Sequence, residues 1–307
     1  MSSLPLFWDK RYVDSFEQSS ILLSSYPHNQ NIFEINTSDL NQDSSSFTFF
    51  LSGQILNYEF NSSIISTFGG VYTSNKDKID TFIINSLEYL SKNYRIQLFK
   101  FRLPPEHLMN FNQRTQIQTL LNLGFKISLM EINYAIELKS WTLNSMSKGN
   151  VKKFNQCVQD NLIFKKLDSD SLSAIYNLLE SNRRNLGTHL SLDLSKLSIL
   201  LKTFPDKYFL FGIFSHDRLI ATSICVETFP TNLYVFYWGD DANFRHYSPV
   251  TFLAKGIIDF AMSRSYDYLD LGTVGPNGDY IVNLARYKQN LGATFSFKYC
   301  LELNRIP

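Results

Sequence analysis

Apolar residues recur along this chain with two spacings, every second residue in short segments and every three or four residues in longer ones. The first spacing is typical of half-buried strands, and the second of amphipathic helices. In the C-terminal half these patterns predict helices at 169–184 and 249–263. They predict strands at 163–167, 208–214, 219–226, 233–238, 266–271 and 294–303, of which 208–214 and 219–226 form a hairpin. A strand, a helix and a strand in succession predict a parallel crossover inside a mixed sheet.

The N-terminal half repeats this order more loosely. Helical spacing at 8–22 precedes a polar connector at 37–46, and two strands, 47–52 and 55–60, are predicted around a turn at Gly53. The remaining predictions are helices at 79–90 and 115–123, the second ended by Gly124, and strands at 96–103 and 132–138. Duplication of one domain explains the repeated order most simply.

The polar stretch 139–150 marks the expected seam between the two halves. The sequence therefore predicts two domains, 1–145 and 146–307, each with a mixed central β-sheet flanked by helices. A basic helix at 151–158 is expected to open the second domain. The predicted fold class is α/β, with a mixed sheet of the α+β kind.

Composition narrows the classes of function. The 307 residues are 44% apolar and carry a net charge of +1, which offers no broad field for DNA or tRNA. No apolar run is long enough for a membrane span, and no leader pattern opens the chain, so we expect a cytoplasmic protein. Three widely separated cysteines predict neither a disulfide framework nor a zinc site, and no metal cluster is evident.

One strand–loop–helix segment has the features of an anion site. A predicted strand ends at Gly239, a polar loop follows, and a helix is expected to begin with Ser248 as N-cap and Pro249 as its first residue. The free amides and dipole of a helix N-terminus favour a phosphate group, which Arg245 or His246 could assist. An ordinary capped helix without a ligand explains the same pattern.

Five elements in the second half occur in the order found in the FemAB-like branch of the GNAT (Gcn-five-related N-acetyltransferase) superfamily. They are an Arg-containing helix end, a hairpin, a Tyr-x-x-Gly strand end before a Pro-initiated helix, an Asp-x-Gly turn and a Tyr-Lys element, at 182–187, 211–223, 237–253, 270–275 and 287–292. The chain resembles that family. The resemblance implies tandem GNAT-like domains, of which the first, with Phe68–Tyr72, forms a substrate-groove wall.

The resemblance also implies an acyl-donor site. GNAT proteins place the pyrophosphate of acyl-CoA on a loop of the form Arg/Gln-x-x-Gly-x-Gly/Ala, and this chain has Arg245 but replaces both small residues, by Ser248 and Val250. Acyl-CoA, such as acetyl-CoA, is then the expected co-substrate, without a metal. The cofactor-binding residues implied are Arg245, His246, Tyr247, Ser248 and Val250.

Three residues are candidates for the chemistry of acyl transfer. Lys288 matches a lysine associated with the active site of FemAB-like transferases, and it could meet an acyl carbonyl or a phosphate. Asp270 ends a strand, where it could orient the amine or take its proton, and Tyr237 could protonate the leaving group. A surface lysine, a carboxylate that caps the following turn, and a core tyrosine are the structural alternatives.

The expected function is therefore an acyl-CoA-dependent N-acyltransferase that acts on an amine of a small or peptidyl acceptor. One alternative is Fem-type transfer from aminoacyl-tRNA to a peptidoglycan precursor. The near-neutral charge and the lack of room for a helical arm after Leu186 argue against it. A catalytically inactive GNAT-like binding protein is the other alternative, since both small residues of the phosphate loop are replaced.

Overall fold

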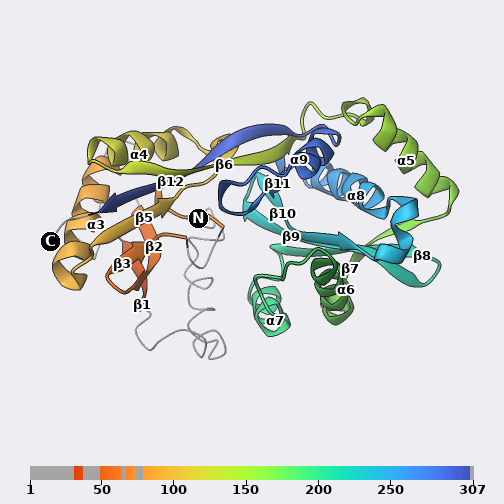
Figure 1. Cartoon of the computed structure of the whole chain (residues 1–307), viewed down its shortest axis with the longest axis horizontal. Helices are drawn as coiled ribbons and strands as arrows, with labels where there is room; N and C mark the ends of the chain where they lie inside the picture. Colours follow the sequence, from red (N-terminus) through yellow and green to blue (C-terminus); the bar gives the residue numbers. More distant parts are fainter. Residues whose placement is uncertain (1–30, 37–48, 64–66, 74–78, 305–307) are drawn as a thin grey trace. The chain divides into compact units, whose positions relative to one another are not determined.

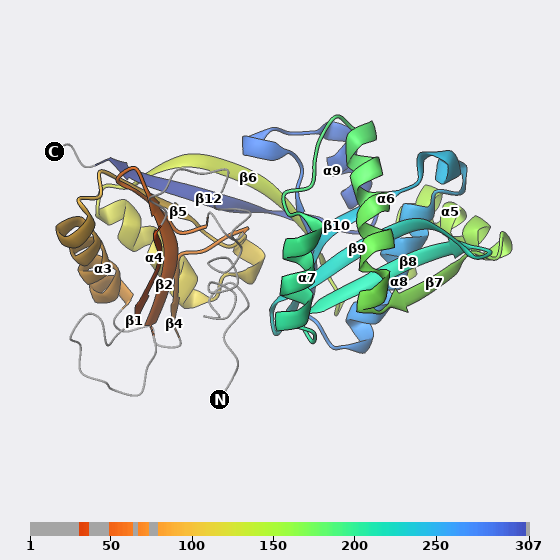
Figure 2. The same cartoon turned by 90° about the horizontal axis from the view of Figure 1, so that it is seen from below.

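The computed structural model describes residues 31–36, 49–63, 67–73 and 79–304 (Figures 1 and 2). The helix predicted at 8–22 and the connector at 37–46 lie outside these residues. The described residues form two compact units, one of those up to residue 132 together with 296–304, and one of residues 133–295. The sequence predicts the seam between 145 and 146. The observed boundary lies earlier because residues 133–137 pair with residues 268–273 of the second unit. The C-terminal strand returns to the first unit, so in sequence the second unit is inserted into the first.

The first unit contains a mixed sheet. Its strands run in the order β1, β2, β3, β5, β12 and the first part of β6 (residues 126–132), with β4 on β2, and β3 and β5 pair in parallel. The bounds are β1 Asn31–Asn36, β2 Phe49–Leu56, β3 Glu59–Asn61, β4 Val71–Thr73, β5 Leu98–Arg102 and β12 Thr294–Asn304. Helices α3, Ile79–Tyr94, and α4, Phe111–Asn122, and the short η2, Glu106–Leu108, complete the described part of this unit. Residues from the strands and both helices share one apolar core.

The turn between β2 and β3 is not where the sequence places it. β2 continues through Gly53, and the turn falls at Asn57 and Tyr58, whose φ angles are 49° and 63°. The prediction of a turn at Gly53 is therefore wrong. A Cβ at Gly53 would lie 2.6 Å from the ring of Phe60, so glycine is needed there for packing inside the strand.

The second unit contains the other strands of the mixed sheet, and helices cover both of its faces. Strands follow the order β6, β11, β10, β9, β8 and β7, and only β10 and β11 pair in parallel. The bounds are β6 Lys126–Glu137, β7 Ile163–Leu167, β8 Tyr208–Ser215, β9 Arg218–Phe229, β10 Asn232–Asp240 and β11 Tyr268–Thr273. Residues 133–137 of β6 pair with β11 in this unit.

Helices cover both faces of this part of the sheet. Helices α6, Leu172–Asn185, and α7, Leu194–Thr203, lie on one face, whereas α5, Lys148–Gln159, and α8, Pro249–Ser263, lie on the other (Figures 1 and 2). The remaining helix is α9, Val282–Gln289. Four short helices complete the unit: η3 Leu143–Ser145, η4 Ser169–Ser171, η5 Ala242–Tyr247 and η6 Pro276–Gly278. The predicted crossover from β10 through α8 to β11 is confirmed, as is the α/β fold class. No helix in the described ranges is long and apolar enough to cross a bilayer.

Candidate active site where two parallel strands diverge

The two parallel strands of the second unit pair only at their beginnings. Asn232, Leu233 and Tyr234 of β10 face Tyr268, Leu269 and Asp270 of β11, although β10 continues to Asp240. β11 has a bulge between Asp270 and Gly272, where Gly272 adopts a φ of 76°. Beyond the bulge β11 pairs with β6 and no longer with β10. The carboxyl ends of such strands are where open α/β sheets bind ligands, so this divergence is the candidate site.

Lys288 holds the bulge from helix α9. Its side chain lies almost entirely inside the protein, with 3% of the residue exposed, so the alternative of a surface lysine is wrong. The ammonium donates to the carbonyls of Leu271, Gly272 and Thr273 at 2.6, 2.9 and 2.8 Å. An ammonium has three N–H groups, so all of them are engaged.

Burial and the neighbouring carboxylate oppose each other in their effect on Lys288. Desolvation lowers the pKa of Lys288 to about 7, and the charge of Asp270 acts in the opposite direction. A neutral amine has only two N–H groups and would leave one of the three carbonyls without its donor. The proton on Lys288 and the geometry of the β11 bulge are therefore coupled.

Asp270 braces the same bulge from inside. It is 2% exposed, and its Oδ1 accepts hydrogen bonds from the amide of Asn133 and from the backbone N–H of Gly272, both at 2.8 Å. Asp270 thus caps the turn at Gly272, which is the structural alternative that the sequence analysis gives for this residue. The structure thus brings Asp270 and Lys288 together.

Tyr237 lies elsewhere in the second unit. Its hydroxyl exchanges a hydrogen bond with Ser191 and accepts one from the backbone N–H of Leu192 at 3.1 Å, in the segment between α6 and α7. Burial raises the pKa of Tyr237, while Ser191, Leu192 and the charge of Arg183 lower it. Among the described residues Tyr237 makes no hydrogen bond to Asp270 or Lys288. Asp270 and Lys288 therefore lie together, whereas Tyr237 lies apart from them.

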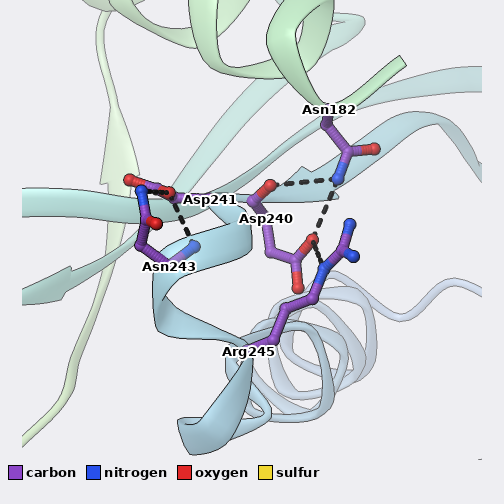
Figure 3. A network of polar contacts seen from close by, with 5 residues as sticks. All are labelled: Asn182, Asp240, Asp241, Asn243 and Arg245. Atoms are coloured by element: carbon purple, nitrogen blue, oxygen red, sulfur yellow. Dashed lines mark hydrogen bonds and ion pairs between the residues drawn. The ribbon is translucent and has the colours of Figure 1, made fainter. Parts of the chain in front are cut away.

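A polar network closes the carboxyl end of β10 (Figure 3). The amide of Asn182, on α6, donates to the carbonyl oxygen and to Oδ1 of Asp240 at 3.0 and 2.9 Å. Arg245 donates from Nε to the same Oδ1 at 3.3 Å. A Cβ at Gly239 would lie 2.8 Å from the side chain of Asn182, so this glycine lets α6 approach the strand.

Arg245 keeps part of its hydrogen-bonding capacity. Its side chain is 49% exposed, and its two terminal nitrogens have no partner among the described residues. In Figure 3 the guanidinium lies beside the carboxylate of Asp240. An arginine with a free pair of donors suits a phosphate or a carboxylate.

The start of α8 differs from the prediction in one respect. Pro249 is the first helical residue and Ser248 occupies the N-cap position, as predicted, but Ser248 has φ 57° and ψ 47° and its side chain caps no amide. The N–H of Ser248 donates to the carbonyl of Arg245, that of Thr251 donates to Ser248, and Pro249 has none. The short helix η5 thus runs directly into α8 and uses amides that a pyrophosphate would need.

The other residues expected to bind the cofactor lie around this junction. His246 is exposed and its ring lies 4.1 Å from that of Tyr247, whose carbonyl accepts from the thiol of Cys157 at 3.0 Å. Val250 is half-buried. Adjacency in sequence already places these residues together.

Several residues of the site escaped sequence reasoning. Asn133 and Ser191 carry no pattern that marks them, because their partners are remote in sequence. Asn182 begins a motif that supports the family resemblance, and only its contact with Asp240 shows its role. Tyr287 packs its ring edge-on against Trp238 at 5.8 Å, and burial raises the pKa of its hydroxyl.

The three cysteines of the chain lie in the described residues and form no disulfide. Cys157, Cys225 and Cys300 are free, and burial raises the pKa of all three thiols. Within the described ranges no group of three or more His, Cys, Asp or Glu side chains is placed to hold a metal ion.

Comparisons with solved structures define the class of fold. FemX matches with a TM-score of 0.72 at 13% identity, covering 99% of this chain and 94% of that chain. An Agrobacterium fabrum domain assigned to a lysylphosphatidylglycerol synthetase matches with a TM-score of 0.64 at 10% identity, over 96% and 93% of the two chains. A tandem GNAT protein from the clavulanic acid biosynthesis pathway gives 0.53 at 7% identity, over 99% and 98%.

These likenesses show the fold at identities too low to show more. No family model matches the sequence, and no curated protein is similar to it in sequence. The chain has the FemAB-like, GNAT-type fold that the five sequence elements predict.

Proposed function

We propose that this protein is a transferase that moves an activated acyl group onto an amine. The observation that carries the proposal is the divergence of β10 from β11 at a bulge held by Lys288 and Asp270. Divergent strands expose backbone groups and admit a substrate chain between them, whereas continuous pairing would fill that space. The FemAB-like fold of the chain agrees with this reaction class.

The proposed reaction has three parts. The amine nitrogen attacks the carbonyl carbon, the bond from this carbon to the sulfur or oxygen of the donor breaks, and a proton passes from the amine to the leaving group. Negative charge develops on the carbonyl oxygen between these steps and requires fixed dipoles or cations nearby. Lys288 supplies positive charge at the bulge when it is protonated, and Asp270 keeps the bulge in shape. Tyr237 is the proposed donor of the proton to the leaving group.

The first candidate for the donor is acyl-CoA, with acetyl-CoA as its simplest form. The free nitrogens of Arg245 and the exposed ring of His246 support this choice, because both are suited to a phosphate beside the start of α8. Ser248 and Val250 complete the proposed loop. The acceptor is an amine of a small or peptidyl molecule, and the proposed location is the cytoplasm.

The second candidate for the donor is an aminoacyl ester, as in the aminoacyl-tRNA used by Fem-type proteins. One structural observation favours it: the amides of Ser248 and Thr251 are engaged within the chain, which weakens a pyrophosphate site. The near-neutral charge of the chain opposes it, since tRNA binding requires clustered cations.

Two binding measurements separate these candidates. Isothermal titration with acetyl-CoA is expected to give saturable binding, and longer acyl-CoAs are expected to compete. Filter binding with charged tRNA is the parallel measurement for the second donor. Binding of tRNA without binding of acyl-CoA would make the aminoacyl ester the preferred donor in place of acyl-CoA. If neither donor binds, the chain is a GNAT-like binding protein and the transferase proposal fails.

A further inference from the structure

An apolar groove lies along helix α8, on the side of α8 that meets α5 and β7 in the second unit. Its volume is about 490 Å³, and four phenylalanines line it together with Val158 and Gly256: Phe154, Phe164, Phe252 and Phe260. Volumes of this order, with an apolar lining and a few charged groups, are typical of sites for small ligands. None of these residues has a role in the proposed transfer.

Aromatic packing fixes the walls of the groove. Phe154 and Phe252 stack with centroids 5.5 Å apart, and Phe164 stacks on Phe211 at 5.4 Å. A Cβ at Gly256 would lie 2.3 Å from the ring of Phe164, so the glycine keeps α8 close to this ring. Val158, on α5, is 51% exposed. The walls are thus preformed, and apolar surface in the groove remains open to solvent.

Charges are distributed unevenly along the groove. Lys255 lies 5.5 Å from the centre of the Phe154 ring and is paired with Asp259 at 2.5 Å. Two further cations adjoin the lining residue Phe260 without lining the groove themselves: Lys166 and Arg264 lie 6.0 and 5.4 Å from the centre of its ring. Neither of these two cations forms an ion pair with a residue in the described ranges. The end at Phe260 therefore has two cations without a counter-ion.

We propose that this groove binds one fatty acid, with its alkyl chain along the phenylalanines and its carboxylate between Lys166 and Arg264. The stretch of α8 from Phe252 to Ser263 spans about 16 Å, enough for an extended alkyl chain of medium length. Burial of each methylene group stabilises such a complex. An arginine donates to a carboxylate with two parallel N–H groups, which selects an anionic head over a neutral one. The site is independent of the proposed transferase activity.

Titration calorimetry with laurate below its micellar concentration tests the proposal. We expect saturable binding with one laurate per chain, and weaker binding of methyl laurate because its head has no charge. The double substitution Lys166→Gln with Arg264→Gln is expected to weaken laurate binding about tenfold. Binding of methyl laurate should change little.

Lys165→Gln is the matched control. Lys165 adjoins Lys166 on β7 but lies 4.9 Å from the ring centre of Phe214, because successive strand residues point to opposite faces. This substitution removes the same charge from the same strand and should leave laurate binding unchanged. An equal loss in the control and in the double variant would show general charge attraction and overturn the assignment.

Val158→Trp provides a steric test that leaves the core intact. The indole would occupy the groove from an exposed position, and we expect laurate binding to be lost while thermal unfolding remains unchanged. Retained binding would place laurate elsewhere. If wild-type protein is dimeric in light scattering and Val158→Trp is monomeric, the groove is covered by a second copy and the fatty-acid proposal is wrong. Absence of laurate binding to the wild type is equally decisive against it.

Discussion

The β11 bulge and the start of α8 form two contrasting parts of the candidate site. At the bulge, Lys288 and Asp270 are buried and their hydrogen bonds are made within the protein. At the start of α8, Arg245 and His246 face solvent, and Arg245 retains unpaired donors within the described structure. The proposed transfer would use both a rigid part and an open part, because its chemistry requires a fixed geometry and donor binding requires accessible charges.

The largest effect is expected from Lys288→Met. The substitution leaves three backbone carbonyls without their donor and removes the cation beside buried Asp270, so we expect a loss of about 3–5 kcal/mol in the free energy of unfolding. Urea denaturation measures it. Lys139→Met is the control, because Lys139 is exposed and pairs with Asp267 at the surface. Equal stability of the two variants would mean that Lys288 does not hold the bulge.

The titration of Lys288 provides a second test of the buried part. Its pKa is about 7 in the folded protein, whereas an unperturbed lysine has a pKa of about 10.4. Between these values the unfolded chain binds more protons than the folded chain, so this residue makes the free energy of unfolding rise with pH. The difference in stability between wild type and Lys288→Met, followed by urea denaturation from pH 6 to 10, is expected to show this slope. A flat difference would mean that Lys288 keeps its proton throughout.

Arg245→Ala tests whether the exposed start of α8 binds the acyl donor. Loss of a charge-assisted phosphate contact is expected to weaken acetyl-CoA binding about tenfold in calorimetry, with little change in stability. Arg184→Ala is the control, since Arg184 is also exposed and its guanidinium pairs with Glu180 on the same helix. Unchanged affinity in Arg245→Ala would remove the start of α8 from the donor site.

The smallest effect is expected from Ser248→Gly. Ser248 has a left-handed backbone conformation, and its side chain accepts no hydrogen bond from the first amides of α8. Glycine at this position therefore relieves backbone strain and removes no capping hydrogen bond. We expect stabilisation of about 0.5 kcal/mol in thermal unfolding. Ser263→Gly, which places the same change in the last turn of α8, should destabilise the protein. Destabilisation by Ser248→Gly would mean that the serine side chain does cap the helix.

Local patterns determined much of the fold. Gly124 follows the last residues of α4 with a φ of 90°, and Pro249 opens α8, because each of these residues constrains its own backbone. The crossover from β10 to β11 follows from the order of three apolar patterns. The helices α7 and α9 were not predicted. The leucines of α7 at 194, 197, 200 and 201 have helical spacing and could have revealed it, whereas α9 is only eight residues long and mostly polar.

The candidate site depends on contacts that no local pattern contains. Asp270 and Asn133 are 137 positions apart, and the carbonyls bound by Lys288 lie 15 to 17 positions before it. The same is true of Gly53, which is glycine because of the ring of Phe60, and of Ser248, whose backbone is set by the junction of η5 with α8.

The sequence alone thus determined the fold class, the crossover from β10 through α8 to β11, and Lys288, Asp270 and Arg245 as candidate residues. Tertiary structure decided which of these side chains are buried, which partners they have and which one remains open to a ligand. The physical reason is that propensity and periodicity act over a few residues, whereas desolvation and hydrogen bonding depend on whatever the completed fold brings within a few ångströms.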